Sequence, residues 1–390
     1  MKKYIFFDGP LYKRLGGPST YLYNLKQEIE KTQRNDIIFI YSGDGEFKNK
    51  KKGIKDTIKS ILTIYPPLLE KVLMMQKKRR KPIFKRLKEI QPGDVVMFHT
   101  TKDFAKASRI LPEGCIKILM SHSPEVSAQE EAKNLKVKFP KYNFSYTENT
   151  YYEKFDLVAF QNADVIVFPS KEAMEPYQKT MPDFNKIIKH KTIKYILTGT
   201  EKLTFKMAKI DFRKKYNIPE SAFIITFIGR HISIKGYDNF IRICSEIIDK
   251  YDNVYVVTAG VGNISSPKHS RWIDIGWTND PGSIVNAANL FILPNKQTYF
   301  DLVLLEMMSL GKVGLVSNTG GNKTMAKFSD GIITYDSVAD AIKKFDELYQ
   351  NPKKLSDLEK KNLEVYKKAF TVRKFCERYL DFFDSLEKKD

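Results

Sequence analysis

The chain has 390 residues, of which 42% are hydrophobic and 29% charged, with a formal net charge of +20. This length exceeds the size at which one hydrophobic core keeps growing, so two domains are expected, and the composition excludes a disordered or fibrous protein. The three cysteines (Cys115, Cys244 and Cys376) are odd in number and far apart, and the chain has no Cys/His cluster, which argues against disulfides and structural zinc.

The amino terminus begins with a short apolar segment. Residues 4–7 are followed at once by Asp8-Gly9-Pro10, so the segment is too short for the core of a signal peptide. No stretch of the chain approaches the length needed to span a bilayer. We therefore expect a cytoplasmic protein that meets a membrane only at its surface.

Residues 4–7 read as the first strand, and residues 37–41 as the second. The loop after the first strand contains Gly16 and Gly17 and leads through Pro18 into a helix expected at 19–31. Glycines at a helix start allow backbone N–H groups to approach a phosphate, although an isolated Gly-Gly is also compatible with a simple turn.

Basic residues gather in two blocks, at 48–55 and 77–88, on either side of an apolar stretch at 61–75. This pattern fits an interfacial segment on anionic lipid, and it fits equally a core-facing helix with solvated ends. A net charge of this size also attracts nucleic acid or phosphorylated substrates, or reflects a lysine-rich solvated surface.

Two further strands are expected at 95–98 and 116–120, and a histidine lies at the carboxyl end of each: His99 directly after the first, and His122 one residue beyond the second. The next stretch, 125–152, has little periodicity and is expected to form a helix and a loop. Strands at 164–168 and 191–197 then precede a linker near 200–209.

The second half of the chain continues to alternate buried strands with turns and helices. A strand at 223–228 is followed by Gly229, Arg230 and Lys235, and two cations at this spacing can grip a diphosphate. Strands are also expected at 254–258 and 272–275. Gly260-Val261-Gly262 follows the first of these, but polar residues and Pro267 come next instead of a helix, so a dinucleotide site is not inferred.

Ligand chemistry is expected between two buried strands, at 290–293 and 313–316. The polar run 295–301 lies at the carboxyl end of the first strand, where open α/β sheets place their ligands, and a helix follows at 301–310. Glu306 is the one charge inside that helix and needs a partner. Helices are expected at 335–350, 352–369 and 371–386.

These residues carry a family resemblance. The segment Pro294, Phe300, Leu302, Leu305-Glu306, Met308, Gly311 and Gly320-Gly321, with Phe227-Ile228-Gly229-Arg230 and Lys235-Gly236-Tyr237-Asp238 upstream, resembles the donor site of retaining GT-B glycosyltransferases of family 4. The resemblance implies an α/β protein of the GT-B fold, with two doubly wound Rossmann-like domains facing each other across a cleft. The domains would be 1–200, with the helix at 371–390 packing back on it, and 201–370.

The resemblance also implies roles for individual residues. Arg230 and Lys235 would bind the donor diphosphate, Glu306 the ribose hydroxyls, and His122, with His99 second, would lie near the reacting sugar. Other donor-side positions are Gly16, Gly17, Gly229, Thr298, Phe300, Asp301 and Leu302. The chain departs from the family pattern in three places: Thr298 replaces an acid, Asp301 replaces a glycine, and Asn322-Lys323-Thr324 stands where a glutamate often follows.

The expected function is transfer of a sugar, with retention, from a nucleotide sugar to a saccharide acceptor. A UDP-sugar is favoured as donor and a lipid-linked acceptor in cell-envelope or exopolysaccharide synthesis is favoured, with an anionic membrane surface as a second partner. No metal, cofactor or nucleic acid is expected, because cationic side chains can neutralise the leaving group. Alternatives are a catalytically degenerate GT-B binding subunit, a protein acceptor, a phosphorylase and a nucleic-acid-binding protein.

Overall fold

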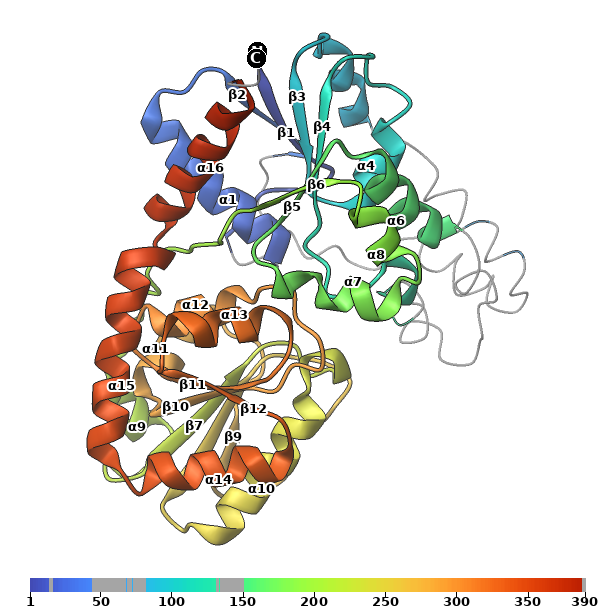
Figure 1. Cartoon of the computed structure of the whole chain (residues 1–390). Coiled ribbons are helices and arrows are strands. Elements are labelled where there is room, and N and C mark those ends of the chain that lie inside the picture. The colour runs from blue at the N-terminus through green and yellow to red at the C-terminus, as the bar shows by residue number, and fades with distance from the viewer. Residues whose placement is uncertain are drawn as a thin grey trace. The chain divides into compact units, whose positions relative to one another are not determined.

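A computed structural model describes residues 1–13, 17–43, 82–130 and 151–387, with the single positions 68, 72 and 133. The chain divides into two compact α/β units (Figure 1). Unit 1 comprises 1–168, 176–196 and 381–390, and unit 2 comprises 169–175 and 197–380.

Unit 1 is built on a six-stranded, wholly parallel sheet in the order β2-β1-β3-β4-β5-β6. Its strands are β1 (Lys3–Phe7), β2 (Ile37–Tyr41), β3 (Val95–Phe98), β4 (Ile116–Met120), β5 (Val165–Phe168) and β6 (Thr192–Tyr195). Strands β3 and β5 are buried at every position. Parallel strands covered on both faces read as such continuous apolar runs.

The helices of unit 1 cover both faces of its sheet (Figure 1). They are α1 (Gly17–Ile29), η1 (Glu30–Thr32), η2 (Pro82–Glu89), α4 (Thr101–Ala107), α6 (Tyr151–Asn162), α7 (Glu175–Thr180) and α8 (Phe184–Ile188). Aromatic packing fills the core between sheet and helices: Phe6 contacts Phe84 of η2, and Phe98 contacts Phe104 of α4.

Unit 2 has a second six-stranded parallel sheet, in the order β12-β11-β10-β7-β8-β9. Its strands are β7 (Phe223–Ile228), β8 (Val254–Ala259), β9 (Trp272–Asp274), β10 (Leu290–Leu293), β11 (Val313–Ser317) and β12 (Ile332–Tyr335). From β7 the chain adds β8 and β9 on one side, and it then returns to add β10, β11 and β12 on the other side. This is the doubly wound strand order. The expected helix at 335–350 is wrong at its start, because Tyr335 pairs with Ser317 as the end of β12.

Helices also cover both faces of the unit 2 sheet. Helices α10 (Tyr237–Lys250) and α14 (Val338–Tyr349) pack on one face, through a core that includes Phe240 and Phe345. Helices α9 (Lys209–Lys215), α11 (Pro281–Ala287), α12 (Leu302–Met308) and α13 (Gly320–Phe328) pack on the other. The unit also contains η4 (Glu172–Met174), η5 (Ser233–Lys235), α15 (Pro352–Val365), a π-helical turn (Tyr366–Phe370) and the first part of α16 (Val372–Glu387).

The last helix, α16, contributes to both units. Gly199 lies against its start, where a Cβ atom would stand 2.5 Å from the Thr371 carbonyl oxygen, so a side chain at this position is excluded. Its final residues join unit 1 through ion pairs: Asp384 binds Arg34 at 2.8 Å and Glu387 binds the buried Lys3. Arg34 also forms a two-pronged contact with Asp36, and these pairs hold the pKa of Asp36 low.

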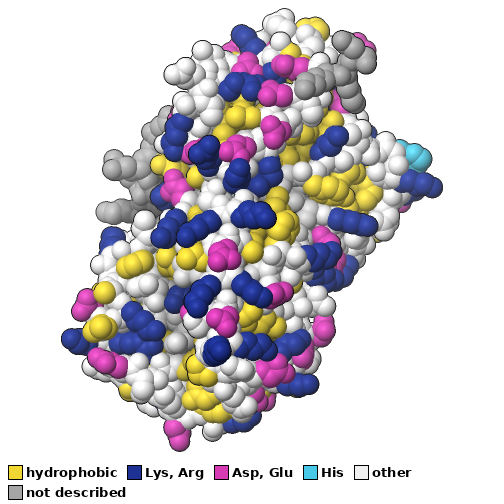
Figure 2. Space-filling view, turned by 60° about the vertical axis from the view of Figure 1, so that its left-hand side comes forward, with side chains coloured by type: hydrophobic (Ala, Val, Ile, Leu, Met, Phe, Trp, Pro, Cys, Tyr) yellow, Lys and Arg dark blue, Asp and Glu magenta, His cyan; other side chains and the backbone are white. Residues whose placement is uncertain are grey.

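Charges of both signs are mixed on the surface. Figure 2 shows Lys and Arg side chains spread over the face it presents, with Asp, Glu and hydrophobic side chains among them. The basic block at 48–55, and residues 77–81 of the second block, lie outside the described residues; Lys85, Arg86 and Lys88 are on η2. Within the described part of the chain, no helix is long and apolar enough to cross a membrane.

Candidate functional site

The site of interest in unit 2 lies where the strand order reverses, between β7 and β10. Loop A (residues 229–236) follows β7 and loop B (residues 294–301) follows β10, so both leave the carboxyl edge of the sheet side by side. Ligands of open α/β sheets bind at this position, because the connections that follow the two neighbouring strands run to opposite sides of the sheet and leave a crevice between them. Loops A and B contain most of the residues that the sequence assigned to the donor site.

Loops A and B are bound to each other. The Lys296 N–H donates a hydrogen bond of 3.1 Å to the Ile234 carbonyl. Gly236 has a left-handed backbone (φ 69°), and a Cβ atom there would stand 1.7 Å from the Pro294 carbonyl oxygen. Only glycine allows this approach. The contact sets the position of Lys235, the residue before it.

The two predicted phosphate-binding cations have different surroundings. Arg230 is exposed and forms no ion pair with any residue that the structure describes. Lys235 is largely buried and donates to Asp301 Oδ1 at 2.6 Å. The other carboxylate oxygen of Asp301 accepts a hydrogen bond from the side-chain amide of Asn295. The sequence did not single out Asn295, although its place directly after Pro294, at the end of β10, could have indicated it.

Glu306 lies on α12, partly exposed, five residues after Asp301. At about 1.5 Å per residue, this separates the two positions by about 7.5 Å along the helix axis. Four neighbours of Glu306 on α12, Leu304, Leu305, Met307 and Met308, are buried, whereas Glu306 itself is partly exposed. Burial, with the nearby charges of Glu201 and Glu306, raises the pKa of Tyr366.

Thr298 sits deeper than the sequence suggested. Its side chain is 1% exposed, and its hydroxyl oxygen has no hydrogen-bond partner among the described residues. A Cβ atom on Gly320, whose φ is 44°, would meet the Thr298 carbonyl oxygen at 1.9 Å, so loop B is packed tightly against the start of α13. Phe300 and Leu302 are partly buried against the hydrophobic core between the unit 2 sheet and helices α12 and α13.

The start of α13 is occupied by a carboxylate from the same unit. Glu175 Oε2 accepts a hydrogen bond of 2.8 Å from the Gly320 N–H and one of 3.0 Å from the Lys323 ammonium. A carboxylate at this end of a helix is favoured by the helix dipole. The first N–H of α13 is therefore already satisfied within the protein.

In unit 1, the loop after β1 was expected to face the donor phosphates. Gly16 lies outside the described residues, and Gly17 is exposed as the first residue of α1. Ser19 fastens the loop to this helix, because its hydroxyl accepts from the Tyr12 N–H and donates to the Pro10 carbonyl, both at 2.8 Å.

The two histidines predicted at strand ends in unit 1 form a pair. His99 Nδ1 and His122 Nε2 are 2.8 Å apart, and the rings lie nearly parallel at 16°. Tyr21 packs edge-on against the His122 ring at 4.5 Å. Burial lowers the pKa of His122 to about 3, and burial together with the neighbouring imidazole lowers that of His99 well below its usual range. Both rings are therefore neutral at physiological pH.

The geometry favours one arrangement of protons in this pair. His99 Nε2 is buried without a partner among the described residues. A buried N–H without an acceptor is rarer and costlier than an unused lone pair, so we expect the His99 proton on Nδ1, donated to His122 Nε2. His122 then carries its own proton on Nδ1.

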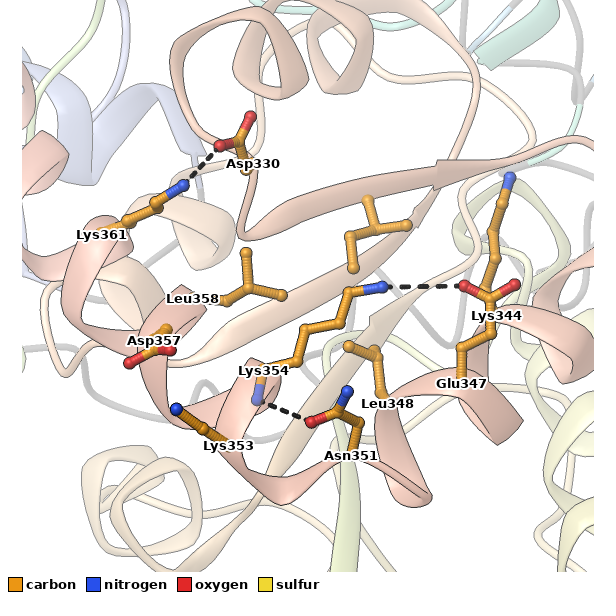
Figure 3. A pocket seen from close by; sticks show the side chains of 11 residues that line it. Asp330, Lys344, Glu347, Leu348, Asn351, Lys353, Lys354, Asp357, Leu358 and Lys361 are labelled. Carbon is orange, nitrogen blue, oxygen red and sulfur yellow. Dashed lines mark hydrogen bonds and ion pairs between the residues drawn. The ribbon is translucent and has the colours of Figure 1, made fainter.

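A second hollow of unit 2 lies beside the start of β12, at the end of the sheet opposite loops A and B. Some of its charged residues are paired with one another. Lys354 and Lys361 line it, but each faces an acid: Lys361 is 2.8 Å from Asp330, and Lys354 is 3.8 Å from Glu347 (Figure 3). These lysines are neutralised, and the hollow lies away from the carboxyl edge where α/β sheets bind ligands. Among the described residues, no group of three His, Cys, Asp or Glu side chains could hold a metal ion.

Part of unit 2 is similar to a known protein family. Residues 208–365 match the family described as glycosyl transferases group 1, and this segment contains Arg230, Lys235 and Glu306. The O-antigen biosynthesis glycosyltransferase WclY of Escherichia coli is 24% identical over 187 residues, which are 46% of this chain and 51% of WclY. The UDP-Gal:alpha-D-GlcNAc-diphosphoundecaprenol alpha-1,3-galactosyltransferase of Escherichia coli is 27% identical over 140 residues, 33% of this chain and 36% of that enzyme. The chain thus spans about half, or less, of these curated relatives.

The fold is shared over the whole chain with a solved structure. HepE of Anabaena, in complex with UDP and glucose, superposes with a TM-score of 0.66 at 15% identity, covering 99% of this chain and 100% of HepE. The chain therefore has the GT-B fold, and a segment of its unit 2 is similar to the glycosyl transferases group 1 family.

The histidine pair makes a prediction for pH dependence. The pKa values of both rings are lowered in the folded protein, so the unfolded chain binds more protons below about pH 6.5, and stability falls as the pH decreases. The loss should approach about 1.4 kcal/mol per pH unit for each histidine until the folded pKa is reached. Urea unfolding of the wild type and of His122→Gln across about pH 7 to 5 tests this. The variant should lose part of the pH dependence, and an imidazole of the pair that titrates by NMR in this range would contradict it.

Proposed function

We propose that the protein is a glycosyltransferase that binds a nucleotide sugar at loops A and B and transfers its sugar to a saccharide acceptor with retention. The observation that carries the proposal is that loop A, which contains Arg230 and Lys235, lies beside loop B at the reversal point of the unit 2 sheet and contacts it through Lys235. Two cations there suit a diphosphate, and both lie within the segment matched by the glycosyl transferases group 1 family.

The residues supply the chemistry that such a transfer needs. As the sugar leaves, negative charge grows on the nucleoside diphosphate, and Arg230 and Lys235 can stabilise it. Glu306, when ionised, can accept hydrogen bonds from a ribose diol. His122 of unit 1 is neutral at physiological pH, because its pKa is far below that range, so it can offer a hydrogen bond from Nδ1 but no charge.

A UDP-sugar is the donor that the similarities favour. HepE was solved with UDP and glucose, and one curated relative is named for its use of UDP-Gal. The same relative is named for a lipid-linked acceptor, GlcNAc-diphosphoundecaprenol. We extend both features to this chain, with a lipid-linked saccharide in cell-envelope or exopolysaccharide synthesis as acceptor and with its work done at the cytoplasmic face of the membrane.

A GT-B protein that binds nucleotide without catalysis is the second candidate. Two observations favour it: Thr298 has a buried hydroxyl where the resembling family has an acid, and Lys235 is engaged by Asp301. Release of free UDP from UDP-sugar in the presence of acceptor distinguishes the candidates. Binding without any turnover, over a panel of sugars and acceptors, would favour the binding protein.

Removal of either cation should weaken nucleotide binding. Each charge-assisted contact contributes about 1.5–3 kcal/mol, so Arg230→Ala and Lys235→Ala should each weaken UDP binding about tenfold or more. Glu306→Gln should also weaken it, because a neutral amide is a poorer acceptor for the ribose hydroxyls. Calorimetry on folded protein measures all three. Lys361→Ala, which removes a lysine at the opposite edge of the same sheet, is the matched control and should bind UDP as the wild type does. Unchanged affinity in both cation variants would refute the site.

The charge of the amino-terminal half leads to a prediction for membranes. Each Lys or Arg near an anionic surface contributes about 1 kcal/mol, so a handful suffices for reversible binding. The wild type should sediment with anionic vesicles at low salt and dissociate at high salt, and a variant with Lys77, Lys78, Arg79, Arg80 and Lys81 replaced by Gln should bind less. Equal binding by both proteins, or no binding to anionic vesicles, would leave the charge as a solvated surface.

A further inference from the structure

Asp301 is the N-cap residue of α12, directly before Leu302, where an aspartate ordinarily accepts a hydrogen bond from the helix backbone. Here its side chain makes no such bond. Both carboxylate oxygens are used elsewhere, one by the Lys235 ammonium at 2.6 Å and the other by the Asn295 amide. The side chains of Lys235 and Asp301 are only 22% and 18% exposed, so water screens the pair weakly.

We propose that Asp301 is a built-in counter-ion of the diphosphate site. It occupies Lys235 when the site is empty, it is displaced from Lys235 when the donor diphosphate binds, and it takes Lys235 back when the nucleoside diphosphate leaves. This inference rests on the proposed function, because it requires that Lys235 is a diphosphate-binding cation.

The competition follows from charge and reach. A phosphate oxygen bound to Lys235 would lie within a few ångström of the Asp301 carboxylate, and two anions on one ammonium repel each other. Arg230 forms no ion pair among the described residues, so it is open to a ligand where Lys235 is not. The diphosphate therefore contacts Arg230 first, and it then displaces the Asp301 carboxylate from the Lys235 ammonium.

The pair formed by Lys235 and Asp301 is not needed to hold loops A and B together. Loops A and B are already joined by the hydrogen bond from the Lys296 N–H to the Ile234 carbonyl and by the close approach of Gly236 to Pro294. Lys296 adds a further link, since its ammonium binds Ser233 Oγ at 2.8 Å and Asp238 at 2.5 Å. The loops remain connected without the pair, so its removal should change ligand binding more than folding.

The size of the effect depends on how often the pair is formed in the empty site. A binding-competent state that is populated only about one time in ten lowers the apparent affinity about tenfold. Asp301→Asn keeps the size of the side chain and its capacity to accept from Asn295, but it removes the charge. It should therefore tighten binding of the nucleoside diphosphate about tenfold, which a merely structural residue would not do when mutated.

The experiment uses the full-length protein and whichever of UDP, GDP and ADP raises the melting temperature of the wild type. Affinities are measured by calorimetry for the wild type, Asp301→Asn, Lys235→Ala and the double variant, at low and high salt. Asp301→Asn should bind about tenfold more tightly and with a steeper salt dependence, and the gain should shrink to less than half in the Lys235→Ala background. Turnover should show stronger inhibition by the nucleoside diphosphate product.

Asp330→Asn is the control, because it removes a carboxylate from a lysine pair at the opposite edge of the same sheet (Figure 3). A gain in that control equal to the gain in Asp301→Asn would reduce the effect to net charge and overturn the proposal. Unchanged or weaker binding in Asp301→Asn would overturn it too, as would an equal gain with and without Lys235. The proposed function fails separately: none of the three nucleotides binding, or Lys235→Ala binding as tightly as the wild type, would refute the diphosphate site itself.

Discussion

The arrangement of the candidate site depends on the reversal of strand order between β7 and β10. Because β8 and β9 extend to one side and β11 and β12 to the other, the loops that follow β7 and β10 are brought together with no strand between them. Gly236 and Pro294 then lock these loops at a distance that no other residue in place of Gly236 would allow. Every candidate donor residue of unit 2 is positioned by this junction.

The electrostatics of the site follow from what surrounds each charge. Arg230 is exposed, Lys235 is paired with Asp301, and Glu306 is partly exposed among buried neighbours on α12. In unit 1, His99 is buried and its hydrogen-bonded partner His122 is partly exposed. The pKa values of both rings are lowered, so hydrogen-bond donation or acceptance remains available to them without a charge.

Much of the fold could be predicted from the sequence, because each buried parallel strand is a continuous apolar run stopped by Pro, Gly or a polar residue. Residues 95–98, 223–228 and 290–293 are strands with the predicted bounds. Strand β12 was missed because its four residues merge, in the sequence, with the helix that follows. The class of the candidate site was also visible, since Arg230, Lys235 and Glu306 follow strands at recognisable spacings.

The pairings inside the site could not be read from the sequence. Lys235 and Asp301 are 66 residues apart, and only the side-by-side placement of β7 and β10 brings them into contact. Likewise, His99 and His122 were each predicted at a strand end, but their hydrogen bond depends on the register of β3 with β4. The burial of Thr298 depends on the approach of Gly320, which no local pattern signals.

The most direct test of the account is amide hydrogen exchange of the full-length protein with and without UDP. The account predicts slower exchange in loops A and B and in the first turn of α12, with no change beside the start of β12. Slower exchange beside β12, with loops A and B unaffected, would contradict the assignment of the nucleotide site to the junction of β7 and β10.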